Sequence, residues 1–310
     1  MKIVITGALG HIGSYLIREL PLSFSGVEIV MIDNLSTQRY CSLFDLPDNA
    51  RYSFVEADIL TVDLNDIFRE AAVVVHLAAI TNAEASFGLR EEVEENNYNA
   101  TVKVAQACEK NGCPMVHLSS TSVYGSQKSV VDEDCSSDEL KPQSPYAESK
   151  LKEEEFLKKL GEEKKFRFVV CRFGTICGVS RGMRFHTAVN KFCWQAVTGQ
   201  TLTVWRTALH QKRPYLELVD AVRAFIFIIK NNLFINEIFN IVTENLAVND
   251  LIQMIKEHLP EINVGYVDAE IMNQLSYEVS TLKIKDHGFD FKGNIRNGVD
   301  ETIRLLQYRN

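Results

Sequence analysis

The sequence lacks the features that mark exported, membrane-spanning or disulfide-rich proteins. Its seven cysteines are odd in number and form no C-x-x-C pair, and some, such as Cys108 and Cys171, lie in apolar periodic runs. They therefore indicate reduced thiols. The longest apolar run, near 224–229, is far too short to cross a bilayer, and no secretory leader pattern precedes the first glycines. We expect a cytoplasmic protein without a membrane partner.

An excess of basic charge is also missing. The chain has 33 lysines and arginines against 41 aspartates and glutamates, which gives a net charge of −8 at pH 7. Because phosphate backbones and acidic membranes require a basic surface, we expect no nucleic-acid partner, and an anionic substrate would need local arginines. The histidines, including His186 and His210, lack carboxylate or cysteine neighbours at metal-site spacing, so no metal is predicted.

The first thirteen residues contain a strand, a glycine-rich loop and the start of a helix. Glycines stand at positions 7, 10 and 13 between an apolar run at 3–5 and a helical pattern that includes His11 and Ile12. Gly7 permits a tight turn, Gly10 lets a pyrophosphate approach the backbone, and Gly13 lets the helix pack closely. The pattern predicts a dinucleotide site, although an ordinary strand-to-helix turn can show the same spacing.

A second apolar strand at 28–32 ends in Asp33, twenty residues after the last glycine. A carboxylate at this position can accept hydrogen bonds from both hydroxyls of an adenosine ribose and would repel a 2′-phosphate. The alternative is a turn residue before Asn34. Together with the glycines, Asp33 predicts NAD rather than NADP as the cofactor.

Strand and helix patterns then alternate through the first half of the chain. Apolar strands are expected near 52–56, 73–77, 115–118 and 166–170, with helices near 64–68, 92–111 and 146–160. This alternation predicts an α/β fold with a doubly wound parallel sheet, the Rossmann arrangement, over residues 1–173. With 310 residues and 46% hydrophobic content, the chain can bury one large core and a smaller second lobe.

The alternation weakens in residues 174–310, which we interpret as a smaller α/β substrate-binding lobe. Helices are expected near 187–198, 219–231 and 249–259, and short strands near 202–204 and 238–241. The lobe should lie over the carboxyl ends of the large sheet, where such sheets bind ligands. Whether it returns segments to the main sheet is left open.

Tyr146 and Lys150 stand four residues apart, which places both side chains on one face of a helix. A neighbouring ammonium and the positive nicotinamide ring of NAD would favour the phenolate, so Tyr146 could act as a base. A surface tyrosine and lysine at helical spacing is the ordinary alternative.

The order of these motifs resembles the short-chain dehydrogenase/reductase superfamily, in its extended branch of NAD-dependent nucleotide-sugar epimerases and dehydratases. The resemblance covers essentially the whole chain. Its landmarks are Thr6-Gly7-x-x-Gly10-x-x-Gly13, Asp33-Asn34, Asp58-Ile59, Leu77-Ala78-Ala79, Asn97-Tyr-Asn-Ala-Thr101, Ser119-Ser120-x-x-Val123-Tyr124-Gly125, Tyr146-x-x-x-Lys150 and Arg213-Pro-Tyr-Leu-x-x-Val219-x-Asp220.

The resemblance implies a role for each catalytic landmark. Ser120 would hydrogen-bond the reacting sugar oxygen, Tyr146 would take the proton of the 4-hydroxyl as hydride leaves C4, and Lys150 would hold the nicotinamide ribose. Asp58 and Ile59 would flank the adenine, and Asn97 would support the backbone of the active site. The expected cofactor residues are Gly7, Gly10, His11, Ile12, Gly13, Asp33, Asn34, Asp58, Ile59, Leu77, Ala78, Ala79, Asn97, Tyr146 and Lys150.

Departures from the family pattern bear on the reaction. Family members that dehydrate carry an Asp-Glu pair after the catalytic residue, and those that decarboxylate carry a glutamate two before the Tyr-Gly pair. Thr121 and Ser122 stand at these places and cannot perform carboxylate acid–base chemistry at neutral pH. Dehydration and decarboxylation are therefore disfavoured, which leaves epimerisation, or simple oxidation or reduction, at C4.

The substrate residues are less regular. UDP-glucose 4-epimerases carry a lysine after strand four and an asparagine after strand six, where this chain has Thr81 and Thr175. The stretch 182–190 resembles R-M-R-x-D-x-x-V-N of relatives that act on less common sugars. Arg184 and Arg213 are diphosphate candidates because a guanidinium matches phosphate oxygens bidentately, although either can be a surface arginine. The predicted substrate residues are Thr81, Ser120, Ser122, Tyr146, Thr175, Arg184 and Arg213.

The sequence therefore predicts an NAD-dependent nucleotide-sugar 4-epimerase that works through a transient 4-keto sugar. The first alternative is a 4-dehydrogenase or ketoreductase with the same residues, and a distant one is a non-catalytic NAD-binding protein. By resemblance, helices near 92–111 and 146–160 would pair with their symmetry mates in a homodimer. The apolar residues that could form this interface, or face the sheet instead, are Val102, Val104, Ala105, Leu151 and Phe156.

Overall fold

The computed structural model describes residues 1–81, 90–125, 129–136, 139–268 and 276–307. Its strands are β1 (Lys2–Thr6), β2 (Glu28–Asp33), β3 (Arg51–Glu56), β4 (Val73–His76), β5 (Met115–Ser120), β6 (Val130–Val131), β7 (Phe168–Phe173), β8 (Thr175–Cys177), β9 (Leu202–Trp205), β10 (Lys212–Glu217), β11 (Glu237–Ile241), β12 (Glu244–Ala247), β13 (Val264–Val267) and β14 (Glu278–Val279). Its α-helices are α1 (His11–Ser23), α2 (Leu64–Phe68), α3 (Arg90–Asn111), α4 (Pro145–Lys164), α5 (Ala188–Val197), α6 (Leu218–Lys230), α7 (Val248–His258), α8 (Leu282–Asp286) and α9 (Ile295–Leu306).

The largest sheet has seven parallel strands in the order β11-β7-β5-β4-β1-β2-β3. The chain builds outward from β1 in one direction through β2 and β3, and then in the other through β4, β5 and β7. The order therefore reverses between β1 and β4, which is the switch point of a doubly wound sheet. The predicted fold class is confirmed.

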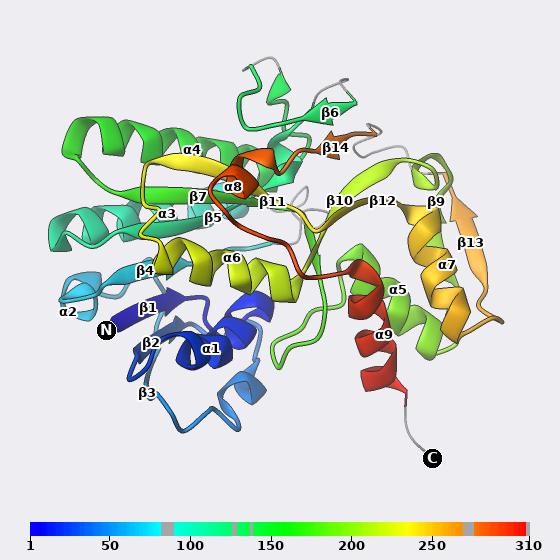
Figure 1. Cartoon of the computed structure of the whole chain (residues 1–310), viewed down its shortest axis with the longest axis horizontal. Helices are drawn as coiled ribbons and strands as arrows, with labels where there is room; N and C mark the ends of the chain where they lie inside the picture. Colours follow the sequence, from blue (N-terminus) through cyan, green and yellow to red (C-terminus); the bar gives the residue numbers. More distant parts are fainter. Residues whose placement is uncertain (82–89, 126–128, 137–138, 269–275, 308–310) are drawn as a thin grey trace.

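Helices cover both faces of this sheet (Figure 1). In β1, Ile3 and Ile5 point to one face and pack in a core with α1 and α6, whereas Val4 points to the other face, toward α3 and α4. Successive strand side chains alternate between faces, so a strand covered on both sides is apolar throughout. This explains why the expected strands of the first half appear as unbroken apolar runs.

A second core lies beside the carboxyl ends of the sheet and belongs to the later part of the chain. Helices α5, α7 and α9 pack together against β8, β9 and β10, and their buried residues include Phe192, Leu251 and Ile303. The small sheets of this region have the orders β12-β10-β8 and β13-β9. The helices expected near 187–198 and 249–259 are α5 and α7.

Two elements of the later part return to the large sheet. Strand β11 pairs with β7 from Glu237 to Ile241, and α6 packs beside α1 on one face. The strand expected near 238–241 is thus an edge strand of the main sheet, not of the lobe. The division into residues 1–173 and 174–310 stays a prediction. Residues 218–241 belong to its second part in sequence but pack with the main sheet. No described helix is long and apolar enough to cross a membrane.

Candidate active site

A cavity of about 610 Å³ lies at the carboxyl ends of β1, β2, β4, β5 and β7, where the strand order reverses. The later part of the chain closes it through Thr175, Arg184 and Arg213. Predicted residues that line it are Gly7, Gly10, His11, Ile12, Gly13, Asp33, Asn34, Asp58, Ile59, Leu77, Ala78, Ala79, Thr81, Ser120, Ser122, Tyr146, Thr175, Arg184 and Arg213. Lys150 and Asn97 are not among the lining residues.

The glycine loop forms one end of the cavity and has room for a diphosphate. Gly7 has a φ of +66°, and a Cβ there would lie 2.7 Å from the Ala78 nitrogen. A Cβ on Gly13 would lie 2.6 Å from the carbonyl oxygen of Gly7. Gly10 caps α1 without a side-chain hydrogen bond, so the first N–H groups of the helix face the cavity, as an anion requires.

Asp33 is held in place at the end of β2. One carboxylate oxygen accepts a hydrogen bond from the Leu9 nitrogen at 3.1 Å and the other from the Leu35 nitrogen at 2.9 Å. Each oxygen keeps a second lone pair for a ribose hydroxyl. Asn34 donates to the Asp58 carboxylate at 3.0 Å and so joins the two loops of the adenosine end. These residues and the glycine cradle fit NAD.

Ser120 ends β5 and begins a short 3-10 turn, Thr121–Val123. Its hydroxyl oxygen accepts hydrogen bonds from the Ser122 nitrogen at 3.1 Å and from the Ser122 hydroxyl at 2.8 Å. Because both lone pairs of Ser120 are then engaged, its own O–H is directed to a further acceptor. Ser120 is thereby set up as a donor inside the cavity.

Tyr146 lies in the first turn of α4, whose start is fixed by the residues before it. The Ser144 side chain accepts a hydrogen bond from the Ala147 nitrogen at 3.2 Å, and Pro145 occupies the first helical position. The helix therefore begins at the mouth of the cavity. Tyr146 reaches the cavity from this turn, and Ser120 lines the same cavity.

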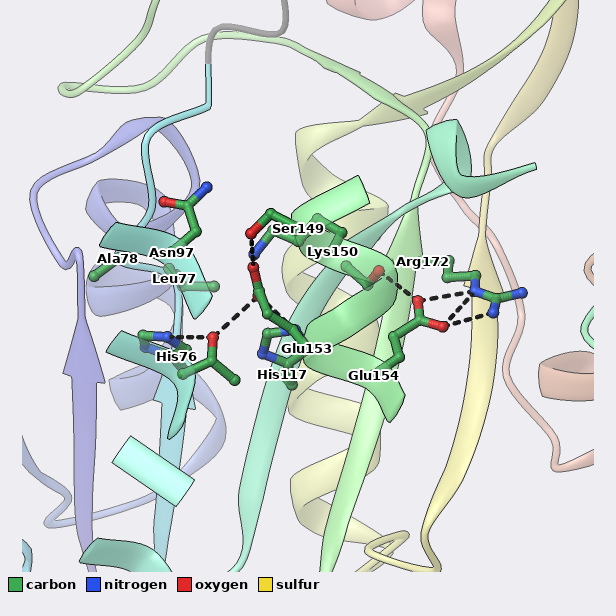
Figure 2. Close-up of polar contacts among 12 residues, drawn as sticks. His76, Leu77, Ala78, Asn97, His117, Ser149, Lys150, Glu153, Glu154 and Arg172 are labelled. Atoms are coloured by element: carbon green, nitrogen blue, oxygen red, sulfur yellow. Dashed lines mark hydrogen bonds and ion pairs between the residues drawn. The ribbon is translucent and has the colours of Figure 1, made fainter. Parts of the chain in front are cut away.

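Lys150 and Asn97 are buried and do not line the cavity; Figure 2 shows both side chains. The Asn97 amide accepts from the Ile80 nitrogen at 2.8 Å and donates to the Ile80 oxygen at 3.0 Å, so it supports the loop after β4. The Lys150 ammonium is buried and donates to the Glu153 carboxylate at 2.8 Å. The sequence analysis did not single out Glu153, because it lies within a run of three glutamates.

Arg184 reaches into the same cavity from the segment before α5. Its guanidinium donates to the Thr81 hydroxyl at 2.5 Å, while its Nε is buried without a hydrogen-bond partner among the described residues. Burial, with the nearby Arg39, lowers the pKa of Arg184 to about 10, although Tyr146 opposes this shift. A buried cation of this kind favours an anionic ligand.

Arg213 lines the cavity from β10. Its guanidinium donates to the Gln211 side chain at 2.8 Å and lies 5.9 Å from the centre of the Tyr277 ring. Thr175, at the start of β8, is the neighbour of Tyr215 in the adjacent strand. Arg213 and Thr175 therefore reach the cavity from two adjacent strands, β10 and β8.

Segment 178–184, which we call the strap, crosses the glycine loop. The His11 Nε2 atom lies 2.9 Å from the Gly178 oxygen, and the Ser180 hydroxyl donates to the His11 oxygen at 2.9 Å. The Gly182 nitrogen donates to the Ser14 hydroxyl at 2.9 Å. Burial, and then the charge of Arg184, lowers the pKa of His11 to about 3, so the imidazole is neutral.

Sequence reasoning missed two contributors to this end of the cavity. Arg39 lines it, and its guanidinium lies within 4 Å of the position that a Cβ on Gly10 would take. Burial lowers the pKa of Arg39, whereas Asp33 raises it. Arg39 and residues 178–181 of the strap belong to no spaced motif, because they reach the loop through tertiary contacts. Residues 182–184 lie in the stretch that the sequence already indicated.

Comparison with known proteins supports the same family. The model of the NAD dependent epimerase/dehydratase family matches residues 3–241. A dTDP-D-glucose 4,6-dehydratase of Bos taurus is 28% identical over 319 residues, which cover 97% of this chain and 87% of the relative. A trifunctional UDP-glucose 4,6-dehydratase, epimerase and reductase of Arabidopsis thaliana is 27% identical over 97% of this chain, which spans only 46% of that protein.

Among solved structures, the UDP-glucuronic acid 4-epimerase of Bacillus cereus, in complex with UDP-glucuronic acid and NAD, superposes with a TM-score of 0.88. It is 25% identical, and the match covers 99% of both chains. The glycine cradle, Asp33 and the family match agree on the cofactor, so the prediction of NAD is confirmed. This chain belongs to the NAD dependent epimerase/dehydratase family, whose members act on nucleotide sugars.

Proposed function

We propose that this protein is a nucleotide-sugar 4-epimerase that oxidises C4 of the sugar, lets the 4-keto sugar turn, and returns the hydride to the other face. The observation that carries the proposal is the pairing of Ser120 and Tyr146 in one cavity with the glycine cradle, while Thr121 and Ser122 follow the catalytic serine. These residues support hydride transfer in both directions, and they lack the carboxylates that dehydration or decarboxylation would need.

Tyr146 and Ser120 would share the proton chemistry at the sugar. NAD, when bound, accepts the C4 hydride and gives it back. Tyr146 would take the proton of the 4-hydroxyl as a phenolate and return it to the other epimer. Ser120, whose oxygen already accepts two hydrogen bonds, would donate to the sugar oxygen and hold it near Tyr146.

Dehydration needs an additional acid and base close to C5 and C6. The carboxylates that line the cavity are Asp33, Asp58 and Glu92, within the described residues. Asp33 and Asp58 belong to the adenosine end, and Glu92 is exposed at the start of α3. Because Thr121 and Ser122 cannot replace such carboxylates, the site favours epimerisation although several relatives are dehydratases.

An epimerase must retain its cofactor between the two hydride transfers, whereas a dehydrogenase must exchange it. The strap lies across the glycine loop and is fixed to it through Gly178, Ser180 and Gly182. Of the strap residues, Arg184 alone lines the cavity, so the strap would hold NAD indirectly, by keeping the glycine loop in place. This arrangement supports the epimerase over the 4-dehydrogenase or ketoreductase.

The substrate would be a nucleoside-diphosphate hexose. Arg213 would bind the substrate diphosphate from β10, and Thr81 and Thr175 would contact the sugar near Ser120. The Bacillus cereus neighbour binds UDP-glucuronic acid in the same fold, which supports a UDP-sugar. Arg184, at the end of the strap and near Tyr146, would also bind a diphosphate.

Proton NMR of the purified protein with UDP-, GDP-, CDP- and TDP-hexoses, followed together with NADH absorbance, tests the proposal. The expected result is a new epimer of one nucleotide sugar without free NADH. NADH that accumulates with a 4-keto sugar would replace the proposal with a dehydrogenase, and loss of water from the sugar would replace it with a dehydratase.

We also propose a homodimer that pairs the outer faces of α3 and α4. A surface groove between these helices is lined by apolar Tyr98, Phe156 and Leu160 together with Lys152 and Glu155. Of the five apolar residues expected at such an interface, Val104 and Ala105 are fully buried against the sheet and cannot contribute. Val102, Leu151 and Phe156 are only partly buried and remain candidates.

A further inference from the structure

Glu153 is a fully buried carboxylate one helical turn beyond Lys150. One of its oxygens accepts hydrogen bonds from the Lys150 ammonium at 2.8 Å and from the Thr101 hydroxyl at 3.0 Å, and lies 3.1 Å from His117 Nε2. The other accepts from the Ser149 hydroxyl at 2.8 Å. Figure 2 shows Ser149 and Lys150 of α4 and His117 of β5 around Glu153. Thr101 contacts Glu153 from α3. The carboxylate is thus fixed from several sides.

A buried ion pair of this kind is not a simple source of stability. Removing a carboxylate and an ammonium from water costs about as much as their attraction returns, and apolar residues of similar volume often stabilise a protein better. The surface of α4 offers exposed places for a glutamate, such as that of Glu155. The position of Glu153 beside Lys150 therefore suggests a task in the active site.

The groups around Lys150 and Glu153 determine the charge that each of the two carries. Burial would lower the pKa of Lys150, but Glu153 first, and then Tyr146 and Glu154, raise it above its usual value. Lys150 and His117 in turn lower the pKa of Glu153 to about 2, against the effect of burial. Lys150 is thus an ammonium and Glu153 a carboxylate across the whole working range of pH.

Two histidines stand behind the pair and contribute no charge. His117 on β5 and His76 on β4 are stacked, with ring centres 5.9 Å apart, and burial lowers the pKa of both. His76 contacts Thr101 at 3.2 Å and the Thr6 hydroxyl at 2.7 Å. From Glu153 the network therefore continues through the neutral groups of Thr101 and His76 to Thr6 at the end of β1.

We propose that Glu153 is a positioning residue that holds the buried Lys150 ammonium in place and keeps it charged for the proton transfer by Tyr146. This inference rests on the proposed function. Glu153 accepts one of the three ammonium N–H groups and leaves two for other acceptors. The ammonium lies 5.9 Å from the centre of the Tyr146 ring, so its charge acts on the phenolate from a fixed place.

The substitution Glu153→Gln tests the proposal because it keeps the size and one acceptor oxygen of the side chain but removes the charge. Burial then lowers the pKa of Lys150, because the charge of Glu153 that opposed this effect most strongly is gone. In a plot of kcat against pH, the alkaline limb is expected to move to lower pH by about one unit or more. The value of kcat at pH 9 should therefore fall about tenfold. KM for the sugar should change by less than about threefold, since Glu153 is buried and does not line the cavity.

Glu154→Gln is the matched control. Glu154 is the next residue of α4 and is also buried, but it pairs with Arg172 at 2.6 Å and accepts from the Ser119 hydroxyl at 2.5 Å. Its loss should lower the melting temperature and move the alkaline limb by clearly less than Glu153→Gln does, because Glu154 is the last of the groups that raise the pKa of Lys150. Glu153→Asp keeps the charge, so its alkaline limb should lie closer to that of the native protein than the limb of Glu153→Gln does.

A folded Glu153→Gln protein with an unmoved alkaline limb would overturn the inference, as would an equal shift in both glutamine variants. Retention of NAD on ultrafiltration between pH 7 and pH 10 gives a readout that needs no turnover. Glu153→Gln should lose cofactor at lower pH than the native protein, and unchanged retention would also contradict the inference. A native protein that is inactive on every nucleotide sugar would reject the proposed function instead.

Discussion

The phenol of Tyr146 is the single group on which the proposed proton transfer depends. Tyr146→Phe removes the hydroxyl and keeps the ring in the first turn of α4, so NAD should still bind. Turnover should fall by about 10²- to 10⁴-fold, the usual contribution of a positioned acid–base group. Initial rates and the NAD content of the purified variant check this. Tyr40→Phe, at an exposed position outside the cavity, is the control, and equal rates in both variants would remove Tyr146 from the mechanism.

Glu217 links stability to pH at the junction of the two cores. Its carboxylate accepts from the Asn294 nitrogen at 2.7 Å, and Asp220 accepts from the Gly293 nitrogen at 2.9 Å. Burial raises the pKa of Glu217 to about 7. Because folding favours the protonated form, its contribution to stability is complete below the unfolded pKa and is lost as the pH rises through about 7.

The variant Glu217→Gln cannot ionise and should escape this loss. Relative to the native protein, its free energy of unfolding should therefore increase by about 1–3 kcal/mol between pH 5 and pH 8. Denaturant titrations at the two pH values measure the difference. A constant difference would show that Glu217 titrates normally in the folded protein.

At the level of elements, the strap should govern how long NAD stays bound. A Cβ on Gly182 would collide with the Leu9 carbonyl oxygen and lie 2.6 Å from that of Gly10. Gly182→Ala must therefore lift the strap from the glycine loop. NAD should leave on ultrafiltration about tenfold faster than from the native protein.

Gly298→Ala supplies the control for this prediction. Its Cβ would meet the Cys177 sulfur at 3.4 Å, an ordinary contact, within α9 and away from the loop. Retention of NAD should be unchanged in this variant. If Gly182→Ala also retains NAD as the native protein does, the strap does not hold the cofactor.

The elements that the sequence predicted are those whose signals are local. The glycine loop, Asp33 and the apolar strands could be predicted because turn chemistry and the alternation of elements are local properties of the chain. The partner of β11 could not be predicted, because strand pairing is decided by packing far along the sequence. Arg184 was predicted, but the contact of the strap with His11 and the pairing of Glu153 with Lys150 were not, because no spacing in the sequence reveals such contacts.

At the level of the whole molecule, α3 and α4 should join two copies of the chain. Light scattering at micromolar concentration is expected to give twice the mass of 35.1 kDa. Phe156→Glu would place a charge in the partly apolar groove between these helices and should yield monomers. A native protein with the mass of one chain would contradict the dimer without affecting the proposed chemistry.

The central claim is that the hydride removed from C4 returns to C4 of the same sugar. A substrate deuterated at C4 tests this claim most directly. With the nucleotide sugar identified by the NMR panel, the account predicts an epimer that keeps its deuterium at C4, because a cofactor that stays bound returns the hydride it received. Deuterium found in released NADH, or lost from C4 in the product, would show that the cofactor exchanges and that this protein is a dehydrogenase rather than an epimerase.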